Sequence, residues 1–194
     1  MTGRVYYPAL SCKDPEKTPP SIEQLVSKRV SKKAAEKEWE KTEILRKIHN
    51  KLTIYPTAIC EYNEKDMLLY SQYGGISLVT YFTYLESLAE MERLSWRGSS
   101  KHNVDNFSKD EDEYYKSVIR SLEKLKEAVR DLNEKGIVHG DISFDNIVFD
   151  DKYSYLIDWE RSKEMEGGEE WKVIESLIKT LKICRELIKV KIGW

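Results

Sequence analysis

The sequence predicts an α+β fold, with strands concentrated in its first part and long helices in its second. Three observations predict it. The runs 67–70 and 147–149 are short, apolar and bounded by turn-forming residues, as is typical of strands. Apolar residues recur at helical spacing through 111–135 and again through 171–188. A chain of 194 residues is also long enough to bury a core without the help of disulfides.

The first part of the chain alternates strand and helix signals. A short apolar run, 25–28, predicts a strand that ends at Lys28. A charged amphipathic helix is expected over 32–48, because apolar residues return once per turn there. The strands 55–62 and 67–70 are expected to form a hairpin around an Asn- and Asp-bearing turn.

A glycine-bearing connector joins the two parts. It is Tyr73-Gly74-Gly75, and an apparent helix follows from Leu78. The segment 97–112 collects Gly, Ser, Asn, Asp and Lys, so we expect an exposed or mobile connection there. The long helix 111–135 follows, and Gly136 supplies its stop signal.

The most informative stretch comes directly after that helix. His139-Gly140-Asp141 follows an apolar pair, Asn146 stands five residues after the aspartate, and an apolar hairpin over 147–157 ends at Asp158. A single Asp or Asn in a loop is usually a turn former. The complete order and spacing are far more specific than any one part. Carboxylate and amide oxygens are also ligands that Mg²⁺ prefers.

At these residues the chain resembles the protein-kinase-like superfamily, whose loop is written His-Arg-Asp or His-Gly-Asp and whose second aspartate opens Asp-Phe-Gly. The resemblance implies phosphoryl transfer that depends on ATP and Mg²⁺. Asp141 would orient the acceptor hydroxyl, and Asn146 and Asp158 would bind the metal and the nucleotide. It also implies a bilobal fold, with a reduced nucleotide-binding N-terminal lobe over 1–72 and a minimal helical C-terminal lobe over 73–194.

The same resemblance assigns nucleotide contacts in the first part. Lys28 would contact the α and β phosphates, held by Glu40 on the following helix, with Glu36 as the second choice. Lysine and glutamate abound in this segment, so a solvated charged face is the alternative interpretation. The backbone of Tyr73 and Gly74 would bind the adenine edge. No Gly-x-Gly-x-x-Gly loop occurs in the chain.

Several branches of the superfamily share features with the chain. Ser143 replaces the lysine usual in Ser/Thr protein kinases, and Asp158-Trp159-Glu160 is similar to aminoglycoside and choline kinases. Ile-Val-His-Gly-Asp with a short tail is similar to RIO-type atypical kinases. The segment from Gly3 to Cys12, taken with Lys28 and the connector, resembles the divergent Ser/Thr kinase-like proteins of large nucleocytoplasmic DNA viruses. No Ala-Pro-Glu segment occurs, so control by an activation loop is not expected.

Three functions therefore stand as hypotheses. The favoured one is a minimal atypical Ser/Thr protein kinase, with Asp141, Lys28 and Glu40 as its catalytic residues. The second is a pseudokinase or kinase mimic that binds a partner protein. The third is a small-molecule kinase of the aminoglycoside or choline type. In the favoured mechanism His139 is expected to support its loop by hydrogen bonds rather than to act as an acid or base.

Composition restricts the partners and the compartment. Charged residues nearly cancel, with a net charge of −2, so there is no strong nucleic-acid signal. Cys12, Cys60 and Cys184 are odd in number and lack Cys-x-x-Cys spacing, so we expect neither a zinc site nor a disulfide framework. No apolar run of membrane-spanning length or signal-peptide pattern is present. The expectation is a cytoplasmic protein, in the host cytoplasm if viral, with a protein substrate or partner.

Overall fold

The computed structural model describes residues 4–48, 50–95 and 104–192 of the chain and confirms the α+β class, since helices and antiparallel sheets are both present. The strands are β1 Arg4–Tyr6, β2 Leu25–Ser31, β3 Ala58–Glu61, β4 Asp66–Gln72, β5 Ile76–Ser77, β6 Ile137–Val138, β7 Ile147–Phe149, β8 Ser154–Leu156 and β9 Lys163–Glu164. The helices are α1 Lys32–Lys41, α2 Glu43–Ile48, α3 Leu78–Ser95, α4 Val104–Glu134 and α5 Trp171–Ile192, with short 3₁₀ turns η1 Pro15–Lys17, η2 Ile22–Gln24 and η3 Trp159–Arg161.

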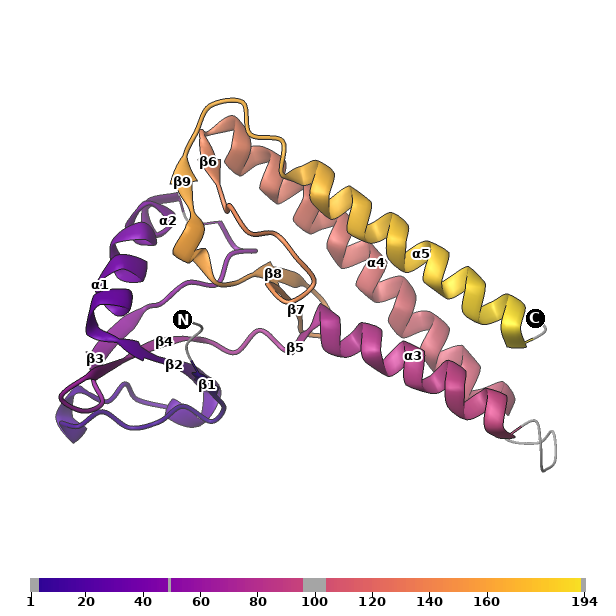
Figure 1. Ribbon diagram of the computed structural model, residues 1–194, viewed down its shortest axis with the longest axis horizontal. Coiled ribbons are helices and arrows are strands. Elements are labelled where there is room, and N and C mark those ends of the chain that lie inside the picture. The colour runs from indigo at the N-terminus through magenta and orange to yellow at the C-terminus, as the bar shows by residue number, and fades with distance from the viewer. Residues whose placement is uncertain (1–3, 49, 96–103, 193–194) are drawn as a thin grey trace.

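The N-terminal sheet is antiparallel, with strand order β1-β2-β4-β3. Successive side chains of β4 point to opposite faces, as in any strand. Leu69 packs with Val30 of β2 and Ala35 of α1 on the inner face, whereas Leu68 and Tyr70 pack on the outer face. Helix α1 thus covers the inner face, and the loop over 7–24 covers the outer one (Figure 1).

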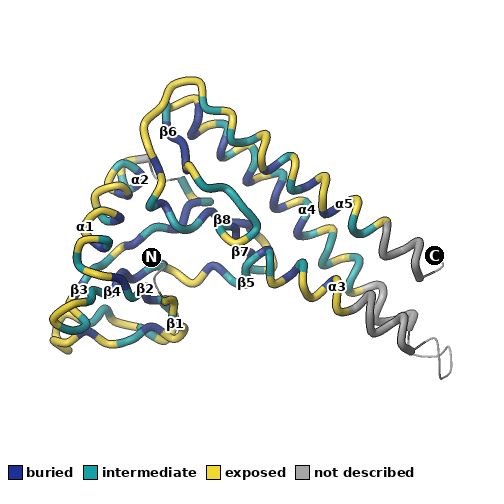
Figure 2. The backbone as a smooth tube through the Cα atoms, in the orientation of Figure 1, coloured by how far each residue is buried: buried dark blue, intermediate teal, exposed yellow. Residues whose placement is uncertain are grey.

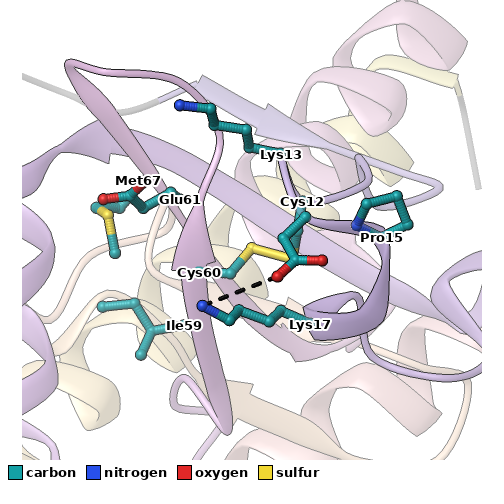
Figure 3. A pocket seen from close by; sticks show the side chains of 9 residues that line it. Cys12, Lys13, Pro15, Lys17, Ile59, Cys60, Glu61 and Met67 are labelled. Carbon is teal, nitrogen blue, oxygen red and sulfur yellow. Dashed lines mark ion pairs between the residues drawn. A yellow bond between two sulfur atoms is a disulfide. The ribbon is translucent and has the colours of Figure 1, made fainter.

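The outer face holds a disulfide between Cys12 and Cys60, which corrects the expectation that the cysteines form no disulfides. The two residues are 48 positions apart, which leaves no spacing signal in the sequence. They meet because the loop over 7–24 folds across β3, where the N–H of Lys13 donates to the carbonyl of Glu61 at 2.8 Å. Figure 3 shows the disulfide in the wall of a pocket of about 620 Å³, which Lys17 and Met67 also line.

The helical part is built from α3, α4 and α5, and α5 runs back along α4 (Figure 1). Buried positions recur along the sides of these helices that face one another (Figure 2). The shared core contains Leu78, Tyr81 and Leu85 of α3, Leu122, Leu125 and Val129 of α4, and Ile174, Ile178 and Leu181 of α5. No described helix is both long and apolar enough to cross a membrane.

Two small sheets belong to the second part of the chain. One has the order β5-β7-β8, and the other pairs β6 with β9. The connector over 73–75 enters the first of them, and Gly75 has φ +89, which favours glycine. A Cβ on Gly75 would lie 1.8 Å from the carbonyl oxygen of Phe149, so a side chain cannot fit there. The connector therefore packs directly against the backbone of β7.

Two predicted elements differ from the structure. The helix expected over 32–48 is divided into α1 and α2 at Thr42, whose hydroxyl donates to the carbonyl of Trp39 at 3.0 Å. The connection expected over 97–112 is helical from Val104 onward, while 96–103 lie outside the described residues. Loop-like composition thus gave way to helix, and within α4 the i,i+4 ion pair Asp112–Lys116 supports the described part.

Candidate active site

His139 holds the loop between β6 and β7 in place. Its side chain is buried, and its ring packs edge-on against Trp159 with centroids 4.5 Å apart. Nε2 donates to the carbonyl of Ile157 at 2.8 Å, and Nδ1 accepts from the N–H of Asp141 at 3.3 Å. Burial lowers the pKa of His139, which fits a neutral ring with one donor and one acceptor. The hydrogen-bonding position expected for His139 is confirmed.

Glu170 is a second support, and sequence reasoning missed it. Its two carboxylate oxygens accept from the N–H groups of His139 and Gly140, both at 2.6 Å. Its own N–H donates to the side chain of buried Asn133, which in turn donates to the carbonyl of Ile137. Charge-assisted bonds of this kind are short and strong. The only signal in the sequence is an acidic residue just before the start of α5, and acidic residues at helix starts are too common to single one out.

Asp141 lies at the open side of this loop. Its side chain is 40% exposed, and one oxygen is 3.4 Å from Nη1 of Arg161. Gly140 has φ +84, and a Cβ there would be 2.4 Å from the carbonyl oxygen of Arg161. The loop and η3 therefore pack closely behind Asp141 and leave its carboxylate accessible from solvent.

Asn146 connects the loop to the end of β8. Its side-chain nitrogen donates to the carbonyl of Asp141 at 2.9 Å. The N–H of Ile157 donates to the Asn146 carbonyl at 3.1 Å, which brings the residue before Asp158 to the same place. Because the nitrogen is engaged, the side-chain oxygen is the Asn146 atom suited to a metal.

Asp158 meets the N-terminal sheet through Lys28. The Lys28 ammonium lies 2.8 Å from Oδ1 of Asp158 and 2.8 Å from Oε2 of Glu38. Burial lowers the pKa of Lys28, but the charges and hydrogen bonds of Glu38 and Asp158 outweigh it, so the pKa is raised and the amine stays protonated. Asp158 has φ +63, an uncommon backbone conformation for a residue other than glycine.

The expected partner of Lys28 is wrong, because the glutamate beside it is Glu38 rather than Glu40 or Glu36. Glu38 is 3% exposed, whereas the other two are exposed. Residues on a helix are separated by about 100° each, so Glu38 and Ala35 share the face that covers the sheet while Glu36 and Glu40 point away. The sequence predicts that a glutamate of this helix pairs with Lys28, but it does not identify which glutamate.

The connector residues lie where β4 meets the helical part. Tyr73 is 39% exposed, and its ring stacks on Tyr7 with centroids 4.3 Å apart. Gly74 is buried, and a Cβ there would be 2.4 Å from the side chain of Ile54 and 2.5 Å from that of Val148. Contact of Tyr73 and Gly74 with adenine stays a prediction.

The donor set fits magnesium. No three His, Cys, Asp or Glu side chains gather to form a metal cluster within the described ranges. Mg²⁺ does not need such a cluster, because it keeps several waters and usually takes one or two protein ligands together with phosphate oxygens. The side-chain oxygens of Asn146 and Asp158 would supply those ligands.

The sequence profile of the RIO domain matches residues 83–181. The chain belongs to the RIO family of atypical protein kinases. No curated protein sequence matches it closely enough to count as a relative.

The RIO match divides the site into two parts. It runs from α3 into α5 and includes Asp141, Asn146 and Asp158 together with Glu170. Lys28 and Glu38 lie outside it, so their place in this RIO protein rests on the ion pairs alone. The arrangement joins an accessible carboxylate, the side-chain oxygens of Asn146 and Asp158 and a fixed ammonium group, which together suit phosphoryl transfer.

Proposed function

We propose that the protein is an ATP- and magnesium-dependent protein kinase of the minimal atypical type, with Ser or Thr hydroxyls as acceptors. The observation that carries the proposal is the contact of Lys28 with Asp158. Asp158 directly follows Ile157, whose carbonyl accepts a hydrogen bond from His139 of the loop. A phosphate-binding cation and an acceptor-binding loop thus meet at one strand end. The RIO match supports the kinase class.

The division of labour follows the two halves of the chain. We assign nucleotide binding to 1–72 and the acceptor side to 73–194. Val5 is 65% exposed and lies opposite Lys28 in the β1–β2 register, so we assign it to the apolar surface that would receive the adenine. Adenine would lie on this surface, with its edge against the backbone of Tyr73 and Gly74.

The chemistry would proceed by positioning rather than by covalent help. Asp141 would orient the acceptor hydroxyl and take its proton as the oxygen bonds to the γ-phosphorus and the bond to the ADP oxygen breaks. Lys28, kept charged by Glu38, would hold the α and β phosphates. Asn146 and Asp158 would supply the protein ligands of Mg²⁺, which when bound neutralises phosphate charge.

The other two hypotheses are distinguishable from this one. A kinase mimic would bind a partner protein without needing nucleotide, and a small-molecule kinase would transfer phosphate to aminoglycosides, choline or sugars but not to polypeptides. No contact in the described part of the chain specifically favours either of them, so both are outcomes of experiments rather than parallel proposals.

The proposal is tested by the thermal stability of the purified protein titrated with ATP, with and without Mg²⁺. A ligand that binds only the native state stabilises it, by about 2.7 kcal/mol at a concentration about 100 times its Kd. We expect a magnesium-dependent rise in Tm that is lost in Asp158→Asn. The matched control is Asp131→Asn, the same change at an exposed site on α4. No rise at millimolar ATP in the unmodified protein would favour the mimic.

A further inference from the structure

A pocket of about 360 Å³ opens directly beside Asp141. It lies between the catalytic loop, β9 and the first turn of α5. Its wall includes Asp141 at one end and the apolar side chains of Val138, Ile142, Met165 and Val173. An acceptor that presents a hydroxyl to Asp141 can therefore place a neighbouring group in this pocket.

The apolar part of the pocket is open to solvent. Met165 is 43% exposed and Val173 is 40% exposed, while Val138 forms a buried floor. Exposed apolar side chains are ordinary when scattered singly. Here they gather at a concave site that includes the proposed catalytic aspartate, which indicates a binding surface for an apolar group.

The charges of the pocket argue against cationic small molecules. Both carboxylate oxygens of Glu170 accept backbone N–H groups, and Asp141 faces Arg161. Lys163 adds a positive charge to the wall. An aminoglycoside would need free carboxylates, and a quaternary ammonium such as choline would need aromatic faces. No aromatic side chain is among the residues that line this pocket.

The backbone of β9 offers a second feature suited to a polypeptide. The N–H of Met165 donates to the carbonyl of Gly136, and Ile137 is paired with Glu164. Hydrogen-bonding direction alternates along an antiparallel pair, so the N–H and C=O of Glu164 point away from β6. Within the described chain, β9 pairs with β6 alone, and its other edge carries no strand.

We propose that this pocket selects the acceptor by binding an apolar side chain of an extended polypeptide, a few residues from the Ser or Thr that faces Asp141. The polypeptide would lie along the free edge of β9, where main-chain bonds supply affinity and alternate side chains enter the pocket. This inference rests on the proposed kinase function and adds a determinant of specificity to it.

The test measures the binding of fluorescent peptides with ADP and Mg²⁺ present. Each peptide carries alanine at the acceptor position, so that no transfer occurs, and one leucine or one aspartate at each neighbouring position in turn. At one position or more, we expect leucine to bind about tenfold more tightly than aspartate, or about 1.4 kcal/mol. Equal affinities at all positions would overturn the inference.

Two variants test whether the leucine preference arises from this pocket. Val173→Glu should remove the leucine preference, and the new carboxylate is compatible with the first turn of α5 because helix N-termini favour negative charge. Met165→Glu makes the same change from the other wall. The control is Ile183→Glu, also on α5, where the replaced side chain is 61% exposed and does not line the pocket. The same peptide affinities in Val173→Glu, Met165→Glu and Ile183→Glu would overturn the inference.

The inference and the proposed function fail in different ways. The Tm rise with ATP and Mg²⁺ is measured on the same preparations. Its absence in the unmodified protein would remove the kinase proposal itself. A normal rise without any peptide preference would remove only the acceptor pocket.

Discussion

The two ends of the candidate site are held together by different means. Around Asp141, backbone groups of neighbouring residues are fixed by His139, Asn146 and Glu170. At the Lys28 end, charges from distant positions meet, since Lys28 and Asp158 are separated by 130 residues. The first end is mainly a property of a local motif. The second exists only after the sheet has docked on the loop, so its stability depends on contacts across the whole fold.

The largest effect is expected in the sheet, from the disulfide. Replacing Cys12 and Cys60 together by serine should lower the free energy of unfolding by about 4 kcal/mol, because the bond closes a long loop in the unfolded chain. Urea unfolding with and without a dithiol reductant measures this. Cys184→Ser, which changes the free cysteine, serves as the control. Identical curves for the oxidised and reduced protein would mean that the two cysteines are unpaired.

The next effect separates two glutamates of α1. Glu38→Gln removes the buried charge beside Lys28 and should cost about 2 kcal/mol of unfolding free energy. It should also weaken ATP binding, because the ammonium group is no longer held in place. Glu40→Gln is the matched control, with an expected change within about 0.5 kcal/mol. Equal losses in both variants would contradict the assigned pair.

A matching pair of variants tests the loop end. Glu170→Gln keeps one acceptor for the two backbone N–H groups but loses the charge, so we expect a loss of about 1.5 kcal/mol. Glu169→Gln changes an exposed neighbour whose side chain pairs with that of Lys172, and it should have little effect. Chemical denaturation compares the two. If Glu169→Gln were the more damaging change, the support assigned to Glu170 would be wrong.

The last effect concerns pH. Burial lowers the pKa of His139 in the folded protein, so below its ordinary value the unfolded chain binds a proton that the folded chain does not. Stability should therefore fall as the pH drops from about 7 to about 5, by at most about 1.4 kcal/mol per pH unit. The slope should be shallower in His139→Asn. An unchanged slope in that variant would assign the dependence to other groups.

Features that depend on local sequence were predicted correctly, whereas features that depend on contacts between distant residues were not. The β7–β8 hairpin, the β3–β4 hairpin and the strand carrying Lys28 each depend on apolar runs with local turn signals, and all three are present. Glu38 could not be chosen from the sequence, because every glutamate of α1 has similar neighbours and only docking decides which face is buried. The Cys12–Cys60 bond has no local signal for the same reason.

The predicted ends of helices were wrong where individual side chains, rather than apolar periodicity, determine where a helix begins or ends. The early helix is interrupted at Thr42, whose hydroxyl bonds to the carbonyl of Trp39, and no apolar pattern reports such a contact. The sequence before Asp112 is dominated by polar residues typical of a loop, so its composition hides the helix that the structure shows from Val104 onward. Glu170 escaped notice because its partners are backbone groups, which look alike in every sequence.

The most direct test of the central claim is the rate of phosphoryl transfer from labelled ATP to a polypeptide acceptor by the unmodified protein and by Asp141→Asn. We predict transfer that falls by about a hundredfold or more in the variant, with the ATP-dependent Tm rise retained. Asp145→Asn, at an exposed position of the same loop, should keep its activity. Comparable turnover in Asp141→Asn and the unmodified protein would contradict the role of Asp141 and, with it, the proposed mechanism.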